Sequence, residues 1–152
     1  MRAMDQLASL FADAGDARRL AGVVSDLHRV APDSDSALYY DATLRFMSGR
    51  TDEAIQLAER LRARDPNHAR CLNLLGAAYA TLGRRDQARQ AFEASVAADP
   101  RDPTAYANLG MFEIEAGNVH AAADYFAEAL TLDPASAPAR DGLARALAAM
   151  GS

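Results

Sequence analysis

The sequence has no lysine and no tryptophan, and its 152 residues include one cysteine, Cys71. A single cysteine excludes a disulfide within the chain and gives no indication of an oxidising compartment. No apolar run approaches the ~20 residues that a membrane-spanning helix needs. Residues 1–16 contain aspartates, Asp5 and Asp13 among them, and lack the apolar centre of a signal peptide. We therefore expect a cytoplasmic protein without a membrane segment.

Positive charge is also scarce. The 16 basic residues are all arginine and are outnumbered by 21 acidic residues, which gives a net charge of -5. This balance does not favour nucleic acid as a partner. Hydrophobic residues make up 50% of the chain and charged residues 24%, as in folded globular proteins. Alanine is abundant and β-branched residues are few, so the composition favours helices over strands.

Glycine and proline recur with a common period of 34 residues. The glycines are Gly15, Gly49, Gly83, Gly117 and Gly151, and the prolines are Pro32, Pro66, Pro100 and Pro134. Glycine commonly follows the last turn of a helix, and the residue before a proline is pushed out of the helical region. Each 34-residue unit is therefore predicted to hold two short antiparallel helices joined by a tight turn.

Apolar residues follow helical spacing between these marks. We number the positions of each unit as slots 1 to 34, counted from Met1. In the unit 69–102 the apolar faces consist of Leu72, Leu75, Gly76 and Tyr79, then Ala88, Ala91, Phe92 and Ser95. Slot 8 holds only small residues: Ala8, Ala42, Gly76, Gly110 and Ala144. We expect the two helices of a unit to cross closely at this slot.

A single helical hairpin cannot bury its apolar face, but stacked neighbours can. The units 1–34, 35–68, 69–102 and 103–136, with a final helix over 137–150, are therefore predicted to form one domain, residues 1–152. This pattern resembles the tetratricopeptide repeat (TPR) family over essentially the whole chain. The resemblance implies an all-α fold, a right-handed superhelical solenoid of antiparallel helix pairs.

The resemblance also implies a binding surface. In such proteins the first helix of each unit lines a concave groove through slots 2, 5, 6, 9, 12 and 13. The peptide-binding groove is then expected to include Tyr39, Tyr40, Thr43, Phe46, Met47, Arg70, Asn73, Ala77, Asn108, Met111 and Arg145. The asparagines offer both donors and acceptors to a peptide backbone, the aromatic and methionine side chains offer contact area, and the arginines can hold a carboxylate. Alternatively, Tyr40 and Phe46 pack against the first unit.

One subfamily holds acidic chaperone tails in a clamp of basic and asparagine side chains. Here slot 5 is never basic, and Pro138 and Gly142 stand where the last basic residues of that clamp would be. The sequence therefore does not favour a chaperone-tail adaptor.

The second unit departs from the repeat at two slots. Slots 7 and 11 hold Asp41 and Arg45, where the third unit has Leu75 and Tyr79. An acid followed by a base at i, i+4 is a favourable helix pair. Two interpretations stay open, an ion pair at the edge of the stack and a polar ledge that contacts a ligand.

Residues with catalytic or metal-binding chemistry are scattered. The histidines occupy different units, and only His68 with Cys71 has the spacing of metal ligands, which two residues alone do not satisfy. The aspartates before Pro66, Pro100 and Pro134 are interpreted as helix-ending residues. There is no phosphate-binding glycine loop and no nucleophile elbow. We expect no enzyme activity, no cofactor and no metal.

Three functions fit these patterns. The first is a non-enzymatic adaptor that holds a peptide or protein segment in the concave groove. The second is a substrate-positioning or regulatory repeat region of a larger multidomain enzyme. The third is weak self-association through the open ends of the solenoid, suggested by the alanine-rich final helix.

Overall fold

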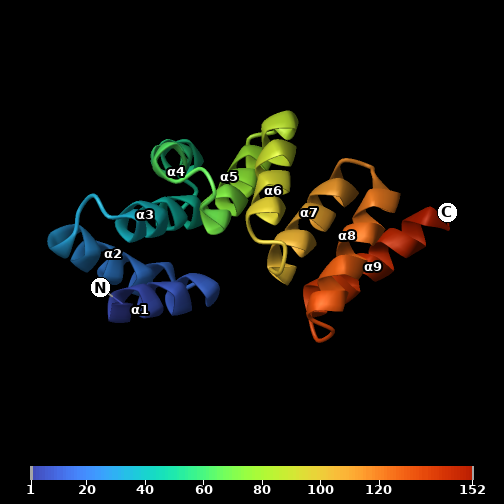
Figure 1. Ribbon diagram of the computed structural model, residues 1–152, viewed down its shortest axis with the longest axis horizontal. Helices are drawn as coiled ribbons and strands as arrows, with labels where there is room; N and C mark the ends of the chain where they lie inside the picture. Colours follow the sequence, from blue (N-terminus) through green and yellow to red (C-terminus); the bar gives the residue numbers. More distant parts are fainter. Residues whose placement is uncertain (1, 152) are drawn as a thin grey trace.

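The computed structural model describes residues 2–151 and folds them into nine α-helices, with no strand among these residues. The helices follow one another in a row along the molecule (Figure 1). Their bounds are α1 (Arg2–Asp13), α2 (Ala17–Val30), α3 (Asp35–Met47), α4 (Thr51–Arg64), α5 (Ala69–Thr81), α6 (Arg85–Ala98), α7 (Pro103–Glu115), α8 (Val119–Leu132) and α9 (Ala137–Met150). From α3 onward, successive odd-numbered helices start 34 residues apart, and so do all the even-numbered ones.

The turn glycines do what the sequence predicts. Gly15, Gly49, Gly83 and Gly117 have φ between 70° and 88°, a left-handed conformation that side chains with a Cβ rarely adopt. Gly151 shares their period but not their conformation, because its φ is -83°. The period therefore locates this glycine at a helix end without requiring the left-handed turn.

The loops between units are ordered by side-chain caps. Asp65 accepts a hydrogen bond from the backbone N–H of Asn67 at 3.2 Å, across the intervening proline, and Asp99 and Asp133 form the same turn. Asp102 and Ser136 cap the helices that follow them. The aspartates before proline thus end helices and begin turns.

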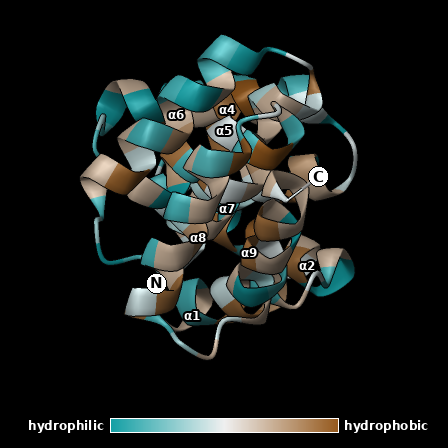
Figure 2. Ribbon diagram, turned by 90° about the vertical axis from the view of Figure 1, so that its right-hand side faces the viewer, coloured by the Kyte–Doolittle hydropathy of each residue, from teal (hydrophilic) through white to brown (hydrophobic). Residues whose placement is uncertain are grey.

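The helices form an all-α solenoid with two faces. Each helix packs against its neighbours in the chain, and each odd-numbered helix also contacts the next one, α1 with α3 through to α7 with α9. The first helices of the units therefore line one continuous face, while α2, α4, α6 and α8 lie outside them. Figure 2 shows hydrophobic residues on the helix sides that face one another and hydrophilic residues on many outward turns. None of the described helices is long and apolar enough to span a membrane.

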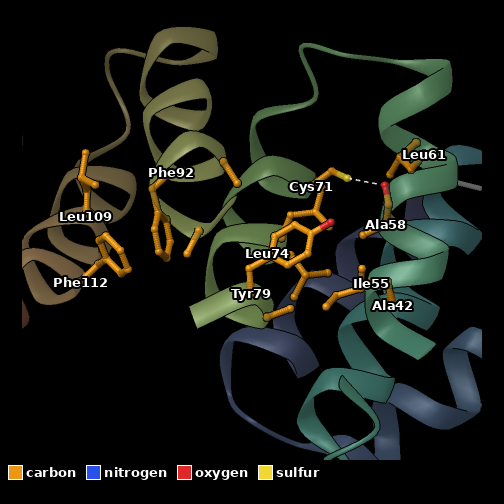
Figure 3. Packing of buried hydrophobic residues seen from close by; sticks show 14 of the residues in the cluster. Ala42, Ile55, Ala58, Leu61, Cys71, Leu74, Tyr79, Phe92, Leu109 and Phe112 are labelled. Atoms are coloured by element: carbon orange, nitrogen blue, oxygen red, sulfur yellow. Dashed lines mark hydrogen bonds between the residues drawn. The ribbon is translucent and has the colours of Figure 1, made fainter. Parts of the chain in front are cut away.

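The core follows the small residues of slot 8. A Cβ added to Gly76 would lie 2.6 Å from the ring of Phe92, so this ring fills the space that a side chain would need. Phe126 is fully buried between Gly110 and Gly142 in the same way. Figure 3 shows Phe92 among the buried side chains that continue from α4 to α7. The predicted close crossing of helices at slot 8 is present.

The final helix keeps the register of the repeat but leaves part of its predicted packed face uncovered. The slots of Leu75, Gly76 and Tyr79 hold Leu143, Ala144 and Leu147 here. Leu143 packs against the C-terminal core cluster, but Ala144 is exposed and Leu147 is 53% exposed. The residues that α9 buries are Ala139, Gly142 and Ala146. In α5, slots 7, 8 and 11 are covered with the help of the unit's own second helix. No such helix covers α9 within residues 2–151, so it packs only through the slots that face the preceding unit.

Candidate functional site

Side chains from four units meet in one cavity of about 360 Å³ on the face lined by the first helices. Its wall is built from Ser9 and Asp13 of α1, Tyr39 of α3, Arg70 and Asn73 of α5, Asp99 and Asp102 of the α6–α7 loop, and Thr104 of α7. Three of the predicted groove residues, Tyr39, Arg70 and Asn73, thus come together here.

A second cavity of about 230 Å³ adjoins the first and shares Tyr39 and Arg70 with it. Its other lining residues are Asp5, Asp35, Ser36, Tyr40 and His68. We call the two cavities together the Arg70 groove. Asp5 and Asp13 lie in slots that point to this face, but Asp35, Asp99, Asp102 and His68 lie outside the slots used for the prediction. The sequence signal for the three aspartates is the acid-rich composition of the loops between units.

Arg70 is held by two tyrosines. Its guanidinium lies 4.9 Å from the ring centroid of Tyr39 and 5.7 Å from that of Tyr40. Its Nη1 donates to the Tyr40 hydroxyl at 3.1 Å, and its Nη2 donates to Oγ of Ser9 at 3.4 Å. Burial raises the pKa of Tyr39, against the opposing influence of Arg70. The Tyr39 phenol therefore stays neutral and can donate a hydrogen bond.

Tyr40 is largely buried and supports Arg70. It is 4% exposed, and its hydroxyl donates to the backbone oxygen of Asp5 at 3.3 Å. The alternative in which Tyr40 packs against the first unit is the one found. Tyr40 therefore positions Arg70, and its direct contact with a ligand stays a prediction.

The remaining predicted residues of α3 are partly committed to packing. Phe46 packs against the central core cluster and Met47 against the N-terminal one. Thr43 donates to the backbone oxygen of Tyr39 at 2.9 Å, one turn earlier in the same helix. These three side chains lie outside the lining of the Arg70 groove.

Two asparagines connect the third and fourth units. The Nδ2 group of Asn108 in α7 donates to Oδ1 of Asn73 in α5 at 3.2 Å. An asparagine amide has two N–H donors and an oxygen with two lone pairs, so this bond leaves donors on Asn73 and an acceptor oxygen on Asn108. Both residues are half-buried on the same face. They form a polar rung suited to a peptide backbone.

The other predicted residues lie further along the solenoid. Ala77 is half-buried in α5. Arg145 of α9 places its Nη1 3.8 Å from the sulfur of Met111 in α7. These three extend the same face toward α9 but do not line either cavity of the Arg70 groove.

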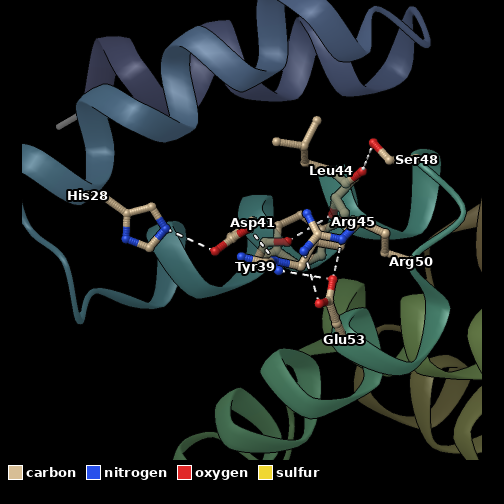
Figure 4. Close-up of polar contacts among 9 residues, drawn as sticks. His28, Tyr39, Asp41, Leu44, Arg45, Ser48, Arg50 and Glu53 are labelled. Atoms are coloured by element: carbon tan, nitrogen blue, oxygen red, sulfur yellow. Dashed lines mark hydrogen bonds and ion pairs between the residues drawn. The ribbon is translucent and has the colours of Figure 1, made fainter.

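The expected ion pair between Asp41 and Arg45 is present and belongs to a larger network (Figure 4). Arg45 Nε donates to Asp41 Oδ1 at 2.9 Å, and its Nη1 donates to Glu53 at 3.1 Å. His28 lies 3.0 Å from the other oxygen of Asp41. Asp41 raises the pKa of Arg45, and Arg50 and Arg45 lower the pKa of Glu53. Partners on α2 and α4 thus take up the charges, which supports the interpretation as an ion pair at the edge of the stack.

The pair of His68 and Cys71 has a structural explanation. Nδ1 of His68 accepts a hydrogen bond from the backbone N–H of Cys71 at 3.1 Å and so caps α5. The Cys71 thiol donates to the backbone oxygen of Ala58 at 3.2 Å, and burial raises its pKa to about 12. Among residues 2–151 no three potential ligands are grouped to hold a metal ion.

Comparison with known proteins places this architecture in a family. Tetratricopeptide repeat models match residues 45–110 and 103–136. No curated protein matches the chain. Among solved structures, the thermophilic TPR protein TTC0263 of Thermus thermophilus is similar with a TM-score of 0.86 and 20% identity, over 99% of this chain and 82% of that one.

Two further structures share the fold. The first TPR of Spaghetti (RPAP3), solved with the HSP90 peptide SRMEEVD, has a TM-score of 0.74 and 22% identity, over 78% of this chain and 94% of that one. MamA has a TM-score of 0.75 and 17% identity, over 95% of this chain and 85% of that one. The two repeat-model matches, the 34-residue helix period and these structures lead to one conclusion: the chain belongs to the tetratricopeptide repeat family.

Proposed function

We propose that this protein is a non-enzymatic cytoplasmic adaptor that holds an extended peptide or protein segment along the face lined by its first helices. The observation that carries this proposal is the polar rung of Asn73 and Asn108 beside the Arg70 groove. An extended peptide brings unpaired N–H and C=O groups with it, and each needs a partner when it leaves water. The rung offers donors and acceptors to both kinds of group.

The groove also has the parts that give a peptide site contact area and orientation. The Tyr39 ring and the Arg70 guanidinium supply a rigid surface, which loses little side-chain freedom on binding. Related folds support a role in protein interaction, since the RPAP3 domain was solved with a bound peptide. The buried free thiol of Cys71 is compatible with a reducing compartment.

The test is selection from a phage library that displays random linear peptides, with the full chain as the target. Selected peptides are then measured against the variant Asn73→Ala/Asn108→Ala. We expect it to bind at least about tenfold more weakly, because two or more backbone hydrogen bonds lose their partners. The matched control is Gln56→Ala/Gln90→Ala, which removes two exposed amides from the second helices.

The control variant is expected to bind like the wild type, and both variants are first shown to unfold at the wild-type temperature. If no selected peptide distinguishes the asparagine variant from the control, the face lined by the first helices is not the binding surface. The adaptor proposal in this form would then be wrong.

A further inference from the structure

We infer that the partner segment is basic, so that lysine or arginine side chains of an extended peptide enter the Arg70 groove. This inference rests on the proposed function and adds the chemistry of the partner. It begins with the charges that line the two cavities. Five carboxylates line them, from Asp5, Asp13, Asp35, Asp99 and Asp102, against one guanidinium, that of Arg70.

The single cation neutralises these acids only in part, because it has a Coulombic interaction with Asp13 but no salt bridge with any of them. Arg70 directs its guanidinium at the rings of Tyr39 and Tyr40 and at two hydroxyl groups. It forms no salt bridge with a carboxylate of the described chain. The guanidinium of Arg70, held against two aromatic rings, is part of the groove lining. The groove therefore presents an excess of negative charge to an incoming ligand.

Most of the carboxylates also lack a cation of their own. Asp35 is paired with Arg64 at 3.0 Å. Asp99 and Asp102 accept backbone N–H groups in turns and caps, which leaves oxygens for other donors. Among residues 2–151, Asp5, Asp13, Asp99 and Asp102 have no salt-bridge partner. These four carboxylates reach the groove from α1 on one side and from the α6–α7 loop on the other.

Asp5 gives an independent indication of a missing donor. Its Oδ1 is buried and accepts no hydrogen bond within the described chain, although the residue lines the smaller cavity. A buried carboxylate oxygen without a donor is costly. An ammonium or guanidinium group in this cavity would place a positive charge beside the carboxylate of Asp5.

The same charges disfavour an acidic ligand. A segment such as the SRMEEVD peptide seen with RPAP3 carries several carboxylates, and here these would approach like charges. The positions that would hold basic side chains toward α9 are Pro138 and Gly142. Electrostatic complementarity guides association and rejects partners of the wrong charge. The groove is thus suited to a basic segment whose backbone lies on the asparagine rung.

The test neutralises the groove without altering its shape. The variant Asp13→Asn/Asp99→Asn/Asp102→Asn removes three charges, and asparagine keeps the ability to cap α7 at position 102. The control Asp52→Asn/Asp86→Asn/Asp124→Asn removes the same number of charges from exposed positions on α4, α6 and α8. The probes are the phage-selected peptides, synthesised with a fluorophore, and their binding is followed by fluorescence anisotropy at low and physiological salt.

We expect the peptides that depend on Asn73 and Asn108 to be rich in lysine or arginine. The groove variant should bind them about tenfold more weakly at low salt, from three charge pairs of modest strength. Its affinity should also depend less on salt than that of the wild type, because fewer exposed charges remain to be screened. The control variant should keep most of the wild-type affinity.

The other outcomes separate the two proposals. If the selected peptides depend on the asparagines but are neutral or acidic, the inference is overturned and the adaptor function stands. If basic peptides bind and both charge variants weaken them equally, attraction by net charge explains the binding and the inference is also overturned. If no peptide depends on the asparagines, the proposed function fails and the inference fails with it.

Discussion

The second and third helix pairs share one frame and fill it differently. In α5–α6, slot 8 is Gly76 and slot 24 is Phe92, whose ring occupies the space of the missing side chain. In α3–α4 the same slots hold Ala42 and Ala58, and both are buried. The first pair combines Ala8 with Val24, and the fourth combines Gly110 with Phe126. The repeat therefore pairs glycine with a large ring and alanine with a smaller side chain, and it keeps the identity of neither slot.

A second contrast concerns polarity. Slots 7 and 11 are Leu75 and Tyr79 in α5 but Asp41 and Arg45 in α3. Asp41 is 8% exposed, and it is tolerated because Arg45 and His28 both contact it. Leu75 is fully buried and its surroundings are apolar. A polar residue in this frame thus needs partners, as Glu113 in slot 11 of α7 also has in Arg89 and Asn118.

The largest effect is expected for Leu75→Asp, which places the charge of α3 in the frame of α5. The new carboxylate would be buried without a cation or a donor, and we expect the free energy of unfolding to fall by at least about 4 kcal/mol. Urea denaturation monitored by circular dichroism measures this loss. Leu75→Ala, with an expected loss of about 2–5 kcal/mol from the cavity alone, separates charge from volume. Equal stability of the two variants would show that slot 7 of α5 is not apolar.

The space shared by Gly76 and Phe92 can be tested by a double-mutant cycle at slots 8 and 24. Phe92→Ala alone should cost about 3–5 kcal/mol, and Gly76→Ala alone about 1–3 kcal/mol, because its Cβ meets the Phe92 ring. The double variant recreates the alanine pair of α3–α4. It should lose less stability than the sum of the single variants, since the added methyl group enters the space that the ring has left. Strict additivity would contradict the idea of a shared volume.

Partial replacement of the polar network of α3 should reduce the free energy of unfolding more than full replacement. Arg45→Ala leaves Asp41 with His28 alone, and we expect a loss of about 1–3 kcal/mol. Asp41→Leu/Arg45→Tyr gives α3 the residues of α5 and should change stability by less than about 1 kcal/mol. Thermal and urea unfolding of both variants provide the comparison. The interpretation as an edge ion pair also requires that peptides selected on the wild type bind the double variant equally well.

Much of this fold could be predicted from the sequence because it is periodic. The turn glycines, the caps at Asp102 and Ser136 and the small residues of slot 8 each act through local geometry, which a single sequence reveals. The final helix was predicted less well, because the exposure of Leu147 depends on whether a second helix covers it. The slot of a residue predicts which neighbouring helix its side chain would face, but it does not reveal whether that helix is present.

The candidate site could be predicted only in part. Tyr39, Arg70 and Asn73 were placed correctly on the face of the first helices, because slots determine faces. The use that each side chain makes of its position was not predictable, since Tyr40 is buried under Arg70 through a contact with Asp5. The loop aspartates of the Arg70 groove were missed for another reason. Asp99 and Asp102 line the same cavity as Asp13 only through the stacking of three units, which no local pattern encodes.

The smallest effect concerns alkaline pH and again separates α5 from α3. The Tyr79 hydroxyl donates to Glu59 at 2.6 Å, and burial, aided by this carboxylate, raises its pKa to about 12. In the unfolded chain a tyrosine pKa is about 10. The stability that depends on the protonated phenol is therefore complete below pH 10 and is lost as the pH rises from 10 to 12. Arg45 in the same slot of α3 has no proton to lose in this range.

We expect Tyr79→Phe to be about 1 kcal/mol less stable than the wild type at pH 8, and the difference should shrink between pH 10 and 12. Urea midpoints measured across this range test the expectation. Glu59→Gln keeps a hydrogen-bond acceptor for Tyr79 but removes the charge that repels a phenolate. Its stability should therefore decline with pH less steeply than that of the wild type and more steeply than that of Tyr79→Phe. Parallel curves for all three proteins would mean that Tyr79 does not contribute to alkaline unfolding and that slot 11 of α5 is stabilised by packing alone.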